Sequence, residues 1–419
     1  MADTRFRSIA PLLLLALLSI LAYAPSLFLP LIEDDYPIIT EARLYGSAAG
    51  FPALIDAPVF RARATSYWTI DALWQAFHFA PPAFHAASLV LHIVNTWLVY
   101  GIALAWPPMR PAALGAAMFF AVHEGHQEAV IWFTAINELL QFLFGMGALW
   151  CWMSAESRKR PWPWRVAGVL LFALAMVSKE SAVILPAFFL LVTPPAQWRR
   201  ALPRLAPYLV LALVTAASIA AASGSSFRFS DGSFSVHAPF WITWSRGIAR
   251  LLWFWGFFAL AVILFRTKAP ALMNSALLAL AWIGVAFLPY SFLEYSTQIP
   301  SRQTYLASAG LVLLFGLALT AVPRKLAAVL LVAMVAHNVG YLWTKKRSQF
   351  LQRAEPTEQL IRLARETNGA IWVRCFPRNR YIAEEAVHVG AGRPPSDLIW
   401  SETEAAQRKP AATFCYEGH

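Results

Sequence analysis

Long apolar segments without charge alternate with short polar ones along most of the chain. The first runs from Ile9 to Leu31, and about twenty such residues suffice to cross a bilayer core as an α-helix. Similar segments follow near 84–106, from 112, and near 137–153, 166–177, 182–192, 205–222, 248–265, 271–290, 306–322 and 326–343. The pattern predicts an all-α polytopic membrane protein with about eleven transmembrane helices.

Two polar regions stand apart from this pattern. Within residues 33–83, SYWTIDALWQAF has apolar residues at helical spacing, which predicts an interfacial helix in an outer loop. In the tail, EPTEQLIRLARETNG is typical of an amphipathic helix that ends at Asn368-Gly369, and AIWVRCF alternates like a strand. We therefore expect a membrane domain over 1–343, with its outer loop at 33–83, and a small extracytoplasmic α/β extension over 344–419.

The composition agrees with a membrane location, because 58% of the residues are hydrophobic and only 14% are charged. Soluble domains carry about 25% charged residues. The net charge of +11 then reports topology, since Lys and Arg collect in cytoplasmic loops. Arg5 and Arg7 place the amino terminus in the cytoplasm, and an odd number of crossings places the carboxyl tail outside. The predicted inner loops contain Arg110, Arg158, Lys159, Arg160, Arg165, Arg199, Arg200, Arg204, Arg266, Lys268, Arg324 and Lys325.

Three further features refine this interpretation. Lys345, Lys346 and Arg347 by themselves would favour the inside for the tail. The first apolar segment is longer than the apolar region of a signal peptide and lacks a small-residue cleavage site, so we expect a retained anchor. Cys375 and Cys415 can pair if the tail faces an oxidising compartment, and Cys151 lies in an apolar run as a small hydrophobic residue.

The stretch LIEDDYPIIT places three consecutive acids, Glu33, Asp34 and Asp35, at the end of the first apolar segment. Carboxylates at a membrane boundary are costly, and three together repel one another, so one can retain its proton unless a cation or substrate intervenes. A structural explanation is that they cap a helix or mark where the span meets water. Three adjacent acids favour a functional role.

Further polar groups fall at the outer ends of the predicted segments. They are His123, Glu124, His126 and Glu128, then Lys179 and Glu180, then Glu294 and Arg302. A transporter more often places such groups at mid-membrane, whereas an interfacial active site needs them at one side. Asp35, His123, His126 and Glu128 are candidate ligands of a divalent metal, although their spacing matches no standard motif. Structural alternatives are an ion pair for Lys179 and Glu180 and a snorkelling side chain for Arg302.

Four segments, in order, resemble the GT-C superfamily of membrane glycosyltransferases, in particular its protein O-mannosyltransferase/TMTC-like branch. They are DDY at 34–36, FFAVHEGHQEAVIWFTAINELL at 119–140, VSKESAVILP at 177–186 and SRQTYLASAGLVLL at 301–314. The resemblance covers roughly residues 8–343. The chain departs from the family pattern at Glu124, Ile136 and Ala307, where the family has Pro, Arg and Pro.

The resemblance implies inverting transfer of a sugar from a polyprenyl-phosphate carrier to an acceptor hydroxyl on a protein, lipid or glycan. Asp34 or Asp35 would then be the general base, and Lys179 and Arg302 would stabilise the departing phosphate. Substrate-binding or orienting roles would fall to His123, His126, Glu128, Glu180 and Tyr305. The sequence identifies no cofactor, and a divalent metal is the one candidate that these residues suggest.

The sequence leaves two other classes of function open. A secondary transporter or lipid flippase would use the same acids for coupling, and a non-catalytic scaffold would use them for structure. No nucleic-acid motif accompanies the basic balance, so no nucleic-acid partner is expected. The interpretation that we carry forward is a glycosyltransferase of a bacterial inner membrane, with the active site on the extracytoplasmic side.

Overall fold

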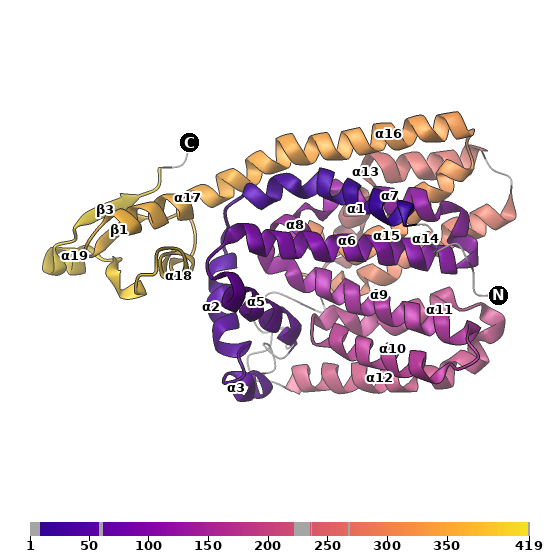
Figure 1. Ribbon diagram of the computed structural model, residues 1–419, viewed down its shortest axis with the longest axis horizontal. Helices are drawn as coiled ribbons and strands as arrows, with labels where there is room; N and C mark the ends of the chain where they lie inside the picture. The colour runs from indigo at the N-terminus through magenta and orange to yellow at the C-terminus, as the bar shows by residue number, and fades with distance from the viewer. Residues whose placement is uncertain (1–8, 58–61, 222–234, 236, 267–268, 418–419) are drawn as a thin grey trace.

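The computed structural model describes residues 9–57, 62–221, 235, 237–266 and 269–417. It is a bundle of helices with a small α/β tail at one end (Figure 1). The apolar helices are α1 (Ala10–Tyr23), α6 (Pro81–Ala105), α7 (Ala113–Val122), α8 (Gln127–Ile131), α9 (Ile136–Ser157), α10 (Trp162–Met176), α11 (Leu185–Val192), α12 (Trp198–Ala221), α13 (Phe240–Arg266), α14 (Pro270–Phe287), α15 (Tyr305–Thr320) and α16 (Arg324–Tyr341).

Short 3-10 helices join many of these elements. They are η2 (Ala24–Phe28), η3 (Pro107–Ala112), η4 (Glu124–His126), η5 (Phe133–Ala135), η6 (Glu180–Ile184), η7 (Pro195–Gln197), η9 (Leu288–Phe292), η10 (Ser301–Thr304) and η12 (Pro395–Asp397). Several begin with proline, which suits the first turn of a helix because it has no N–H to leave unpaired.

The helical class is confirmed, and every predicted apolar segment contains helix. Among the described residues, seven helices are long and apolar enough to cross a membrane, or eight if one bent pair forms a single span. The helical segments Trp162–Met176 and Glu180–Val192 are shorter than that. The expected count of about eleven crossings is therefore not confirmed, because an apolar helix reveals its hydrophobicity in the sequence but not whether it spans.

Helix α15 lies at the centre of the bundle, and nearly all of its residues are buried. It packs against α7, α13 and α14. Two glycines allow this close approach. A Cβ at Gly310 would lie 2.6 Å from the carbonyl oxygen of Ala279, and one at Gly316 would lie 2.7 Å from that of Ala112. Small residues at such positions let neighbouring backbones come together where the lipid provides no hydrophobic driving force.

The first polar loop forms three short helices at the tail end of the bundle: α2 (Asp35–Tyr45), α3 (Phe51–Asp56) and α5 (Ala64–Phe77). Helix α5 contains the stretch SYWTIDALWQAF, so its predicted helical state is confirmed. Helix α2 packs along α5 and buries Tyr36 and Ile39. The loop is thus a folded layer over the bundle end.

The tail begins inside a continuous helix. Helix α16 passes through a π-helical turn, Leu342–Lys346, into α17 (Arg347–Glu366), so the expected boundary near residue 343 falls within one long helix. Three short parallel strands in the order β2-β1-β3 follow, with α18 and α19 between them. These elements are β1 (Ile371–Cys375), α18 (Arg380–Ala391), β2 (Leu398–Ile399), α19 (Glu402–Arg408) and β3 (Ala412–Cys415). The predicted amphipathic helix, the strand and the small α/β extension are confirmed.

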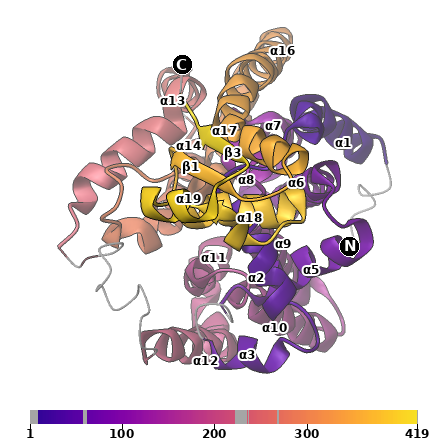
Figure 2. The ribbon, with the colours of Figure 1, turned by 90° about the vertical axis from the view of Figure 1, so that its left-hand side faces the viewer.

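The tail packs against the first loop. Ile361 of α17 and Val389 of α18 share one buried apolar cluster with Leu31 and Ile39. The Tyr36 hydroxyl donates to Glu358 at 3.3 Å, and the Thr40 hydroxyl donates to Glu385. Viewed from that end, the tail lies across the bundle in front of α2 and α8 (Figure 2). The tail and the loop therefore form one structural unit.

A disulfide between Cys375 and Cys415 joins β1 to β3, across a sequence separation of 40 residues. The double variant Cys375→Ser, Cys415→Ser should lower the free energy of unfolding of the tail by about 4 kcal/mol, since the bridge restricts a loop of this length in the unfolded chain. Amide hydrogen exchange should become faster in β1 and β3 and stay unchanged in α15. Cys151→Ser, at a buried unpaired cysteine, is the control. Equal exchange in the double variant and the parent would contradict this prediction.

Candidate active site

The three consecutive acids occupy three different environments. Asp35 is fully buried, and its Oδ1 accepts hydrogen bonds from the backbone N–H and the hydroxyl of Thr134, both at 2.7 Å. Its Oδ2 accepts the backbone N–H of Ile32 at 2.9 Å. Asp34 is exposed, and among the described residues its side chain has no hydrogen-bond or ion-pair partner. Of these two aspartates, Asp34 therefore has the carboxylate that is open to a substrate.

Thr134 belongs to the bend that separates α8 from α9. The segments Glu124–Ile131 and Phe133–Ser157 meet at 97°, with Trp132 in an extended conformation between them. A sharp break leaves backbone N–H groups without helical partners, and a carboxylate satisfies them well. Asp35 thus fastens the first loop to this break, 99 residues along the chain.

Glu33 connects the same loop to the tail. Its carboxylate accepts two hydrogen bonds from Arg353 of α17, from Nε at 3.1 Å and from Nη2 at 2.7 Å, and pairs with Arg378 at 2.8 Å. Two-point pairing between arginine and a carboxylate fixes orientation as well as distance. Glu33 also adopts a positive φ of 47°, which non-glycine residues adopt rarely. The backbone next to Asp34 is therefore held in an unusual conformation by residues of the tail.

Two arginines approach the indole ring of Trp132. Arg302 of η10 and Arg353 of α17 each place the guanidinium carbon 4.7 Å from a ring centroid of Trp132. Arg302 is also tied to Glu128, whose carboxylate accepts its backbone N–H at 3.1 Å and lies 3.8 Å from its guanidinium group. The cation–π contacts hold both guanidinium groups against one ring, while Glu128 fixes Arg302 and Glu33 fixes Arg353.

The positive charges of nearby arginines affect the ionisation of Asp34. Partial desolvation of its exposed side chain by the surrounding protein, and after it the Glu33 carboxylate, raises the pKa of Asp34, whereas the charges of Arg302, Arg353 and Arg378 lower it. The site consequently combines an accessible carboxylate with guanidinium groups close enough to act on it. That is the pairing of charges needed to accept a proton on one side and to bind an anion on the other.

Lys179 and Glu180 lie in a second polar cluster, between α10 and α11. Lys179 is buried and pairs with Glu138, and its Nζ lies 3.4 Å from the Tyr290 hydroxyl. Glu180 pairs with Arg63 of the first loop at 3.1 Å. The ammonium group of Lys179 is therefore already paired with the Glu138 carboxylate. Glu180 connects the first loop to the bundle through Arg63.

His123, His126 and Tyr305 lie in the core below the loop. The Nε2 of His126 is 2.6 Å from the Ser308 hydroxyl, and the Tyr305 hydroxyl is 2.8 Å from Nδ1 of His92. The rings of His123 and His126 are 4.9 Å apart. Within the part of the chain that the structure describes, no group of three or more His, Cys, Asp or Glu side chains is arranged to hold a metal. The four candidate ligands Asp35, His123, His126 and Glu128 are thus not gathered into a metal site there.

Sequence reasoning missed four residues that the structure places at these clusters: Arg63, Trp132, Arg353 and Arg378. Trp132 lies within the segment 119–140 that resembles the family, but the sequence assigns it no role. Arg353 lies in a polar tail with many cations, and its contact with Glu33 spans 320 residues. No local pattern distinguishes it from other arginines.

Comparison with known proteins gives a family model, a curated relative and solved structures. The family model described as Dolichyl-phosphate-mannose-protein mannosyltransferase matches residues 64–222. Protein O-mannosyl-transferase Tmtc1 of Drosophila melanogaster is 30% identical over 103 residues, which are 25% of this chain and 12% of that protein. ArnT from Cupriavidus metallidurans, bound to undecaprenyl phosphate, is 14% identical, with a TM-score of 0.53 over 97% of this chain and 89% of that chain.

A second solved structure agrees. The oligosaccharyltransferase AglB from Archaeoglobus fulgidus, in complex with an inhibitory peptide and a dolichol-phosphate, is 12% identical, with a TM-score of 0.53 over 97% of this chain and 65% of that chain. This chain therefore shares its fold with these two solved proteins. Residues 64–222 and the 103 residues matched to Tmtc1 resemble protein O-mannosyltransferases, as the motifs predict.

Asp35 should make stability depend on pH. Burial, partly offset by its hydrogen bonds to Ile32 and Thr134, raises the pKa of Asp35 to about 7. An aspartate in the unfolded chain has a pKa of about 3.9, so the folded protein binds more protons between these values. The contribution of Asp35 to stability is therefore complete below about pH 4 and declines as the pH rises to about 7.

The variant Asp35→Asn should remove this component of the pH dependence. It should also lower the free energy of unfolding by about 1–3 kcal/mol, because an amide N–H₂ would face a backbone N–H. Thermal unfolding in detergent at a series of pH values measures both effects. Asp56→Asn, at an exposed acid of the same loop, should keep the parent profile. Parallel profiles for Asp35→Asn and the parent would rule out this titration.

Proposed function

We propose that this protein is an integral membrane glycosyltransferase that moves a sugar from a polyprenyl-phosphate donor to an acceptor hydroxyl. The observation that carries the proposal is the exposed Asp34 carboxylate, which directly follows Glu33. Arg353 binds Glu33, and Arg302 and Arg353 both contact Trp132 at the break between α8 and α9. The named relatives support the donor class, because two of the matched proteins were solved with undecaprenyl phosphate or dolichol-phosphate.

Asp34 is the general base of the proposed reaction. The acceptor hydroxyl transfers its proton to the Asp34 carboxylate as its oxygen attacks the anomeric carbon. The bond from that carbon to the phosphate oxygen breaks, and the lipid phosphate leaves with the bonding electrons. Asp35 cannot take this role as readily, because all of its hydrogen bonds connect to the protein interior. Its role is to position Asp34 by holding the loop.

Arg302 and Arg353 bind the departing phosphate. A guanidinium group offers several N–H donors in a planar fork that matches phosphate oxygens, and its charge stabilises the charge that develops there. Lys179 was the other predicted phosphate ligand, but its side chain is only 6% exposed and pairs with Glu138, whereas the side chains of Arg302 and Arg353 are 28% and 26% exposed. We therefore assign Lys179 and Glu180 to the support of the site, together with the buried cluster of His123, His126 and Tyr305. Glu128 orients Arg302.

The extracytoplasmic side is the proposed location of the site. The α9–α10 and α11–α12 connections, which carry many of the basic residues, lie at the end of the bundle away from the tail (Figure 1). Positive loops face the cytoplasm, so the tail would face the opposite side. The disulfide between Cys375 and Cys415 agrees, since such bridges persist in oxidising compartments.

Asp34→Asn should reduce sugar transfer by a factor of about 10²–10⁴, the usual contribution of a general base. The assay is sugar transfer by the purified protein with a panel of polyprenyl-phosphate sugars. Thermal stability and binding of the lipid donor should stay near the parent values, because the Asp34 side chain has no hydrogen-bond or ion-pair partner among the residues that the structure describes. Asp56→Asn should retain full activity. If Asp34→Asn turns over at the parent rate, the assignment of the base fails; if no donor is consumed by the folded parent, the transferase proposal itself fails.

Arg353→Gln should weaken binding of the lipid donor by a factor of about 10–100, as expected for the loss of a hydrogen bond to a charged group. Arg353→Lys should restore part of the affinity, since the charge returns without the planar fork. Donor titrations that separate KM from kcat measure this effect. Arg362→Gln, at an exposed position of the same helix, is the matched control. An unchanged KM in Arg353→Gln, with normal stability, would exclude Arg353 from the donor site.

A further inference from the structure

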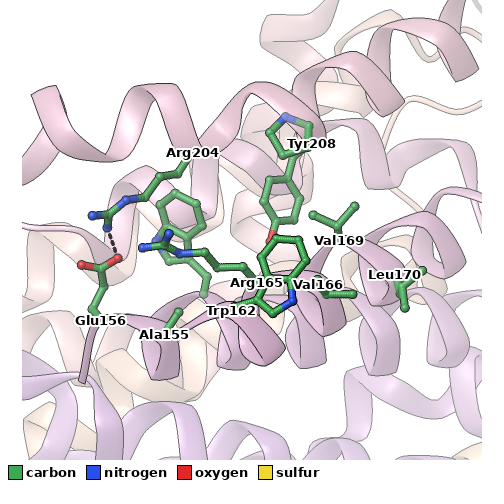
Figure 3. Close-up of a pocket in the computed structure, with 11 residues that line it drawn as sticks. Ala155, Glu156, Trp162, Arg165, Val166, Val169, Leu170, Arg204 and Tyr208 are labelled. Carbon is green, nitrogen blue, oxygen red and sulfur yellow. Dashed lines mark hydrogen bonds and ion pairs between the residues drawn. The ribbon is translucent and has the colours of Figure 1, made fainter. Parts of the chain in front are cut away.

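A pocket of about 420 Å³ lies between α9, α10 and α12, away from the candidate active site (Figure 3). Its walls include Trp152, Trp162, Val169, Leu170 and Tyr208. Volumes of this size are typical of sites for small molecules. Neither the proposed sugar transfer nor the resemblance to known families assigns a role to it.

The pocket has a charged end and an apolar end. Figure 3 shows Glu156, Arg165 and Arg204 gathered on one side, with Val169 and Leu170 on the other. The charged residues lie near helix ends, because Glu156 is in the last turn of α9 and Arg165 is in the first turn of α10. Val169 and Leu170 follow one turn further along α10. The apolar end of the pocket therefore extends along the helices, toward the hydrocarbon layer of the membrane.

The charged end has an excess of positive charge. Arg204 pairs with Glu156, whereas the side chain of Arg165 has no hydrogen-bond or ion-pair partner among the described residues. The connection between α9 and α10 adds Arg158, Lys159 and Arg160, all exposed. An anionic group at this end would thus meet an unpaired guanidinium and a basic loop.

We propose that this pocket binds a membrane phospholipid with an anionic head group. One acyl chain lies along α10 between Val169 and Tyr208, and the head-group phosphate contacts Arg165. A water-soluble anion would leave the apolar wall without a partner. A zwitterionic lipid such as phosphatidylcholine would bring its own cation against Arg165 and the basic loop, so a net anionic head group fits better. Trp162, which is 72% exposed, is placed as aromatic residues often are at the level of the head groups.

The test is lipid retention by the full-length protein, measured by native mass spectrometry in detergent. Phosphatidylglycerol and phosphatidylcholine with the same acyl chains are titrated separately. The parent should retain phosphatidylglycerol about tenfold more strongly, and Arg165→Gln should remove that preference. Arg266→Gln, at an exposed arginine outside the pocket, should leave the preference intact.

A second variant tests the apolar end. Ala155 lies on the pocket wall, so the ring introduced by Ala155→Phe should fill the space and reduce retention of both lipids. Its thermal stability in lipid-free detergent shows whether it folds. Equal retention of the two lipids by the parent, or an unchanged preference in Arg165→Gln, would overturn the proposal. Unchanged retention in a folded Ala155→Phe would place the lipid elsewhere. None of these measurements depends on an assay of sugar transfer.

Discussion

The buried carboxylate of Asp35 is the contact on which the rest of the site depends. It satisfies backbone donors on both sides of a junction, at Ile32 directly before the first loop and at Thr134 in the break between α8 and α9. An unpaired backbone group at this depth would be costly, so the loop and the break stabilise each other's irregular conformations. The exposure of Asp34 is a consequence of this arrangement, because burying the Asp35 side chain leaves the side chain of its neighbour at the surface of the junction.

The tail adds a second constraint on the same loop. Arg353 and Arg378 hold Glu33, while Ile361 and Val389 bury the apolar side of α2. The loop between the first two long apolar helices is thus held from below by the bundle and from above by the last segment of the chain. A tail that began as a separate appendage in the sequence is, in the structure, part of the wall of the candidate site.

The two ends of the bundle show different uses of charge. At the tail end, acids and arginines pair across long sequence distances and position an accessible carboxylate. At the opposite end, basic residues outnumber acids, and Arg165 is left beside an apolar pocket. The first arrangement suits a reaction in which charge moves, and the second suits binding of an anion that is anchored in the membrane.

The sequence by itself determined the helical class, the positions of the apolar helices, the α/β character of the tail and the stretch that contains the catalytic candidate. These features depend on local hydrophobic periodicity and on short motifs, which are complete within one segment. It could not fix the number of crossings, because α10 and α11 have the composition of spans without the length.

Only the tertiary structure decided how the polar residues divide their roles. Asp34 and Asp35 are indistinguishable as neighbours in a sequence, yet one is exposed and the other is saturated by hydrogen bonds. In the sequence Lys179 is a candidate phosphate ligand, but in the structure it is paired with Glu138. No sequence motif marks Arg353 as a site residue, and only the path of α17 places it against Trp132. The physical reason is the same in each case: the availability of a charge depends on its partners, and these partners come from distant parts of the chain.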